Sequence, residues 1–122
     1  MSAQAVRNLD IACAESGREL ASIRDMEERV LNAALTVLEE QGPYAMFLYV
    51  QARHSEVAGE FRRFCVNLLR GVFGERVPAN ADALGAIRAL ANDPDDLLFA
   101  RDLLRNALAY ARYHLKAKGS SS

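Results

Sequence analysis

The feature that most constrains this chain is the recurrence of apolar residues at intervals of three and four, which places them on one face of an α-helix. Only seven Gly and three Pro interrupt the sequence, and its Ala, Leu, Arg and Glu are good helix formers. We therefore expect an all-α protein. The pattern is clearest in a stretch whose apolar positions are Ile23, Met26, Val30, Ala34, Val37 and Leu38.

Glycine, proline and capping residues divide this pattern into segments. The first predicted helix runs from about Ala3 to Leu20, with Gly17 as a weak point. Ser22 stands three residues before Asp25, a spacing typical of a capping box, so it is expected to open a second helix that ends at Gln41. Gly42-Pro43 suits the end of that helix and the start of the next.

The remaining boundaries follow the same logic. The third helix is apolar almost all round from Met46 to Val50, which predicts a position in the middle of the core. Ser55 is expected to cap a fourth helix that closes at Gly74. Further segments are a loop over 75–80, a fifth helix over 82–90 and a sixth helix that begins after Asn92-Asp93-Pro94 and ends near Ala117.

Length and composition fit a single compact bundle of five to six helices over residues 1–118, with a flexible tail over 119–122. Apolar residues make up 51% and charged residues 25%, as in ordinary globular domains. No apolar run reaches the ~20 residues that cross a bilayer, and the first residues lack the build of a signal peptide. We expect a cytoplasmic protein without membrane contact, in which Cys13 and Cys65 are buried thiols.

Common catalytic and metal-binding signatures are missing from the sequence. Neither His54 nor His114 has an acid three residues before it, as a di-metal site in a helical bundle would require. We expect His54 to be solvated and His114 to lie at the core edge, and we expect no enzymatic activity, metal or cofactor. Asp93, Asp95 and Asp96 are interpreted as helix-capping carboxylates.

Basic residues gather in the second half of the chain. Residues 1–60 carry five basic groups against ten acids, whereas residues 61–122 carry ten against six. Four of the ten basic residues lie in the last predicted helix, separated by four, seven and four residues. This spacing places them within a sector of roughly 60° around the helix axis. This basic row is expected to face away from the core and to bind phosphates. It consists of Arg101, Arg105, Arg112 and Lys116, extended by Lys118, with Arg63 and Arg70 as a second short row.

Three short motifs follow one another in a fixed order. A long helix ends in a Gly turn within NAALTVLEEQGPYAMFLYV (residues 32–50), an aromatic helix follows, and the last helix closes with ALAYARYHLKA. In this order they resemble the small helical subunit of type III-B CRISPR effector complexes, the Cmr type, over residues 7–118. The matching positions are Arg7-Asn8-Leu9-Asp10, Gln41-Gly42, Phe47-Leu48-Tyr49, Tyr110, Arg112, Tyr113 and Lys116.

The resemblance implies a non-enzymatic antiviral-defence protein that stacks with copies of itself and with other subunits, and that contacts single-stranded guide and target RNA through the backbone. Stacking could place acids of the second helix against a basic face of the next copy. Pro43-Tyr44 and His114-Leu115 depart from the family's residues, and the last helix lacks its Trp, so a small subunit of another type III complex is an alternative. The acids in question are Glu27, Glu28, Glu39 and Glu40.

Other functions compete with RNA binding. A basic row can also be a solvated helix face placed to favour the helix dipole. The protein would then be a protein–protein adaptor that binds no nucleic acid. A helix-turn-helix regulator of DNA is disfavoured, because three carboxylates within 92–96 would repel the major groove.

Overall fold

The computed structural model describes the backbone of residues 3–120 and the side chains of residues 9–119. Within these residues the chain forms six α-helices and one short 3₁₀ helix, and no strand, which confirms the predicted all-α class. The elements are α1 (Ala3–Ala21), α2 (Glu28–Gln41), α3 (Pro43–Arg53), α4 (Ser55–Phe73), η1 (Gly74–Arg76), α5 (Ala83–Leu90) and α6 (Pro94–Ser120).

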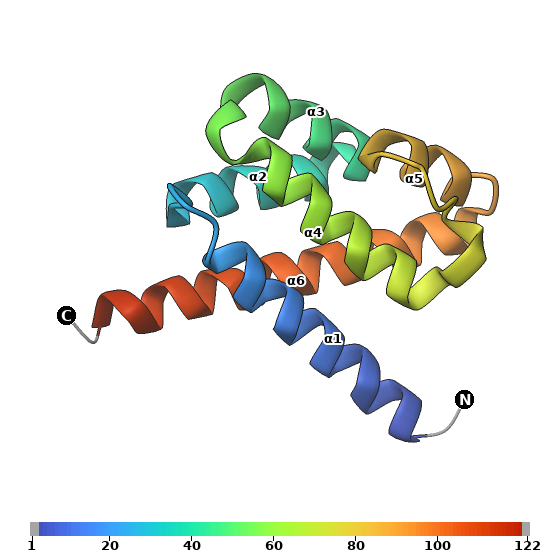
Figure 1. The fold of residues 1–122 in the computed structure, drawn as a ribbon, viewed down its shortest axis with the longest axis horizontal. Coiled ribbons are helices and arrows are strands. Elements are labelled where there is room, and N and C mark those ends of the chain that lie inside the picture. Colours follow the sequence, from blue (N-terminus) through green and yellow to red (C-terminus); the bar gives the residue numbers. More distant parts are fainter. Residues whose placement is uncertain (1–2, 121–122) are drawn as a thin grey trace.

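The longest helix, α6, is the centre of the bundle. It contacts α1, α2, α3, α4 and α5, and Figure 1 shows it running beneath α2 and α4 while crossing α1. The third helix was predicted to hold this central position, and that prediction is wrong. Met46, Phe47 and Val50 of α3 are fully buried, but Leu48 is 45% exposed because α3 packs on α2, α4 and α5 from the outside.

The crossing of α1 and α6 depends on a small residue. Gly17, predicted to be a weak point of the first helix, instead packs directly against α6 with no room for a side chain. A Cβ at Gly17 would lie 2.5 Å from the Cβ of Tyr110 and 2.8 Å from the carbonyl oxygen of Ala107. The Tyr110 hydroxyl donates a hydrogen bond of 2.7 Å to Asp10, and the Cys13 thiol donates one of 3.7 Å to the Leu103 carbonyl.

The second helix begins five residues later than the capping-box spacing predicts, because its N-cap position is Glu27 and not Ser22. The Ser22 hydroxyl donates to the Glu19 carbonyl at 2.6 Å and so finishes α1 instead of capping α2. Asp25 has a φ of 71°, which an α-helix does not allow. Ile23 and Met26 are nevertheless buried, so this connection continues the apolar pattern without being helical.

Other boundaries agree closely with the sequence. Gly42 and Gly74 end α2 and α4 with positive φ, and Pro43 is the first residue of α3.

Three other local predictions differ from the structure. Ser55 is not a cap, because His54 precedes the first turn of α4 and no side chain caps it. The predicted loop after Gly74 contains η1, and α6 continues through Gly119 to Ser120, so the first part of the predicted tail is helical. Residues 121–122 and the side chains of Arg7 and Asn8 lie outside the described residues.

Candidate nucleic-acid interface

The basic row of α6 lies on the flank that faces α2. Arg101, Arg105 and Arg112 are half-buried, and only Lys116 is exposed. The prediction that the row faces away from the core is therefore wrong for its arginines. The reason is that α6 is buried over a wider sector than expected, and α2 packs beside that sector. Its buried residues are Ala100, Leu103, Leu104, Ala107, Leu108 and Ala111.

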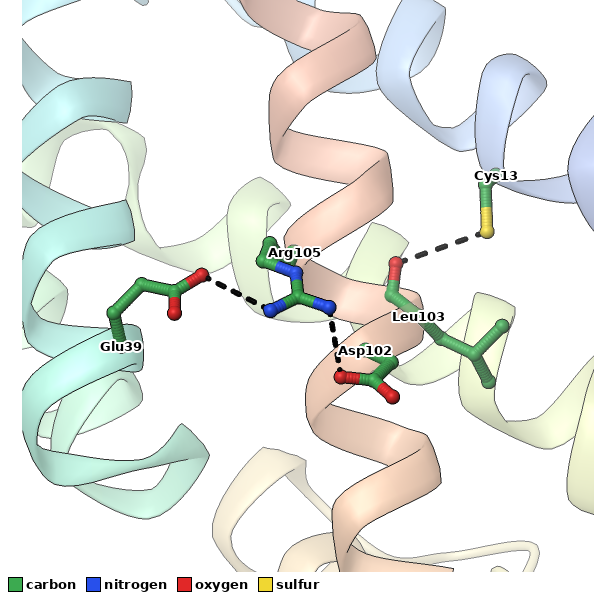
Figure 2. Close-up of polar contacts among 5 residues, drawn as sticks. All are labelled: Cys13, Glu39, Asp102, Leu103 and Arg105. Carbon is green, nitrogen blue, oxygen red and sulfur yellow. Dashed lines mark hydrogen bonds and ion pairs between the residues drawn. The ribbon is translucent and has the colours of Figure 1, made fainter.

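Arg105 lies between two carboxylates, one from each helix. Its guanidinium is 3.5 Å from Glu39 on α2 and 3.0 Å from Asp102 on α6 (Figure 2). The Arg105 side chain is 40% exposed, so both ion pairs remain in contact with water. Asp102 lies three residues before Arg105 in the same helix, whereas Glu39 comes from a distant part of the chain and is the partner that sequence reasoning missed.

Two further contacts extend this arrangement toward the chain end. Arg112 donates a hydrogen bond of 2.9 Å to the amide oxygen of Asn32, and the ammonium of Lys116 lies 3.4 Å from Glu28. We call this arrangement the α2–α6 seam. It consists of Glu28, Asn32 and Glu39 on α2 and Arg105, Arg112 and Lys116 on α6.

The seam corrects the expected role of the acids in the second helix. Glu28 and Glu39 were expected to meet a basic face of another copy, but they meet basic groups of their own chain. A signal for this exists in the sequence. The steps of four and seven that separate Glu28, Asn32 and Glu39 also separate Lys116, Arg112 and Arg105 when α6 is followed backwards. Mirrored spacings of this kind indicate two antiparallel helices whose facing residues pair.

The arginines of α4 lie apart from the seam. Arg70 donates hydrogen bonds of 3.2 Å to the carbonyl oxygens of Pro78 and Ala79. Arg63 stacks 4.8 Å from the ring centre of Phe64 and lies 3.9 Å from Glu60. Together with Arg62 they line an open cavity of about 320 Å³ between α4 and residues 79–83. The structure thus does not join the two predicted basic rows into one surface. Lys118 is exposed near the end of α6.

His54 and the two cysteines are engaged in packing. His54, predicted to be solvated, is buried, and its ring meets Tyr49 edge to face with 5.6 Å between centroids. Burial raises the pKa of the Cys13 thiol to about 11, and burial also raises the pKa of the Cys65 thiol. The Asp93 carboxylate accepts a hydrogen bond of 2.9 Å from the Asp95 amide, as predicted for a cap. Within residues 9–119 no group of three or more His, Cys, Asp and Glu side chains is arranged to hold a metal ion.

The arrangement defines a six-helix all-α protein whose charged side chains bridge its own helices. Comparison with family models, curated proteins and solved structures finds no match to the chain. Among the described helices, none combines the length and the apolar character needed to cross a membrane.

Proposed function

We propose that the chain is a non-catalytic small subunit of a type III CRISPR effector complex, most similar to the Cmr type, that contacts the backbone of guide or target RNA and stabilises the assembly. The order of the helices supports this proposal. A long helix, α2, ends at Gly42, α3 carries Phe47-Leu48-Tyr49, and α6 closes with aromatic and basic residues, as the family resemblance implies.

The observation that carries RNA contact is the exposure of the ion pairs in the seam. Lys116 and Glu28 are 61% and 41% exposed, and Arg105 and Glu39 are 40% and 45% exposed. Pairs with this exposure contribute about 0–1 kcal/mol each, so a phosphate chain can replace the carboxylates at little cost. Contacts to phosphates carry no sequence information, and binding should therefore be independent of RNA sequence.

Salt-dependent RNA binding tests the proposal. The full chain is titrated with single-stranded RNAs of unrelated sequence, alongside a variant with Arg101, Arg105 and Arg112 all changed to Gln. Loss of three phosphate contacts should lower the slope of log affinity against log salt by about 2. A matched control changes Arg18, Arg24 and Arg88 to Gln, since these exposed arginines lie outside the seam.

An equal loss in both variants, or no binding by the unmodified chain even at low salt, would contradict the proposal. Circular dichroism of each variant separates loss of binding from loss of the fold.

A protein–protein adaptor without nucleic-acid binding is the second candidate. The observation that favours it is the pairing of Arg105 and Lys116 with carboxylates of their own chain, which leaves less positive charge for RNA. In an adaptor of this kind the seam only joins α2 to α6. The same titration separates the two functions, because an adaptor gives no salt-sensitive binding to any of the RNAs.

A further inference from the structure

The cavity between α4 and residues 79–83, which we call the α4 cavity, differs from the seam in its charge. Three arginines line it against one carboxylate, that of Asp82. That carboxylate already accepts a hydrogen bond of 2.8 Å from the Gly85 amide as the cap of α5. By contrast, the groove over the seam is lined by two arginines and two glutamates. The α4 cavity therefore holds the larger excess of positive charge.

Arg70 fixes one wall of the α4 cavity. Its guanidinium holds the carbonyl oxygens of Pro78 and Ala79, which are neutral groups, so its charge is not cancelled. The Nε of Arg70 is shielded from solvent and has no hydrogen-bond partner. Because this nitrogen has no accessible surface, Arg70 acts through the two hydrogen bonds to residues 78 and 79, which shape the wall of the cavity.

Arg62 and Arg63 supply positive charges that no short ion pair neutralises. Among the described side chains Arg62 has no ion-pair partner, and Arg63 has only the 3.9 Å pair with Glu60, in which both side chains are more than half exposed. Such a pair contributes little and exchanges readily. Guanidinium groups bind phosphate oxygens with two parallel donors, and Asn67, which also lines the cavity, adds an amide donor.

We propose that the α4 cavity binds a phosphate group of the RNA backbone, as a contact separate from the seam. This inference rests on the proposed function for its RNA. Arg62 and Arg63 contact the phosphate from the solvent side of the cavity. Arg70 positions the opposite wall, which residues 78–79 form. Because the phosphate group alone is recognised, free inorganic phosphate should occupy the same place weakly.

Nuclear magnetic resonance of the full chain tests the site directly. Inorganic phosphate and then a short oligouridine are added at constant ionic strength. Both should shift the Asn67 side-chain amide and the backbone amides of residues 79–83, in a saturable way that chloride does not reproduce. An R62Q/R63Q variant should lose these shifts and, because one phosphate contact is removed, should lower the salt slope of RNA binding by about 0.7. An R18Q/R24Q variant is the matched control and should keep both.

The outcomes separate this inference from the proposed function. Shifts from oligouridine at the seam but not around the α4 cavity would overturn the inference and leave the proposed function supported. Shifts from phosphate at the cavity without any effect of oligouridine would overturn both RNA assignments and show a site for free phosphate. Shifts that follow ionic strength alone would overturn the cavity as a binding site.

Discussion

At the scale of single residues, Gly17 sets the distance between α1 and α6. A side chain there would meet the Ala107 carbonyl and the Ala111 amide nitrogen, each at 2.8 Å, as well as Tyr110. Two of these neighbours are backbone atoms, so no rotamer change relieves the overlap. The helices must move apart, and this would disturb the Tyr110–Asp10 hydrogen bond.

Gly17→Ala should lower the free energy of unfolding by about 1–3 kcal/mol, the usual result of overpacking. Urea denaturation measures it. Gly71→Ala is the control, because a Cβ added at that helical glycine would meet no heavy atom within 4 Å, and the substitution should raise stability by about 0.5–1 kcal/mol. Equal effects of the two substitutions would contradict the close approach of α1 and α6.

Cys13, which lies where α1 crosses α6, should make the unfolding free energy depend on pH. Burial raises its pKa from the ordinary 9.0 to about 11, so between these values the folded chain retains a proton that the unfolded chain loses. The unfolding free energy should therefore fall as pH rises from about 9 to about 11. Comparing urea denaturation of the unmodified chain and of Cys13→Ala across this range isolates the effect. An identical pH dependence in both would contradict the burial of the thiol.

At the scale of elements, α6 owes its central place to one continuous buried sector. Leu104 is completely buried, whereas Leu98 in the same helix is 52% exposed. The two leucines therefore have the same chemistry and opposite surroundings. Their comparison tests the orientation of the helix about its own axis.

Leu104→Ala should lower the free energy of unfolding by about 2–5 kcal/mol, because it removes packed methyl groups and leaves a cavity. Leu98→Ala should change it by less than about 0.5 kcal/mol. Thermal or urea denaturation of both variants measures the difference. A similar loss at both positions would mean that α6 is rotated relative to the structure.

The elements also show how far sequence reasoning reaches. Gly42-Pro43 and Gly74 mark helix ends because local backbone chemistry decides them. The connection over 22–27 was mistaken for helix, because Ile23 and Met26 must be buried whatever their backbone conformation. The α2–α6 seam was missed because pairing between distant helices depends on the whole packing, although mirrored spacings in the two helices carried the information. The α4 cavity depends on the path of residues 78–83, which no local pattern defines.

At the scale of the whole molecule, the acidic and basic halves of the chain meet inside one fold. The charge separation along the sequence suggested a basic surface open to a partner, yet α2 brings Glu28 and Glu39 against α6. If these acids compete with RNA for the basic row, removing them should strengthen binding. This links the stability of the seam to the proposed function.

Glu28→Gln combined with Glu39→Gln should raise RNA affinity about two- to fivefold and lower the unfolding free energy by no more than ~1 kcal/mol, as expected for exposed pairs. Fluorescence anisotropy with labelled single-stranded RNA and urea denaturation give the two quantities. Glu15→Gln with Glu19→Gln removes two exposed acids of α1 as a control. An equal gain in the control would show a general charge effect without competition at the seam.

Membership of an RNA-guided complex can be tested in the cells that produce the protein. A tagged chain is crosslinked to RNA by ultraviolet light, purified under denaturing conditions, and its bound RNA is sequenced. Guide RNAs should be recovered, enriched over an untagged strain and reduced when the basic row is changed to Gln. Recovery of no RNA above the untagged strain, with the tagged chain folded and present, would contradict the proposed function.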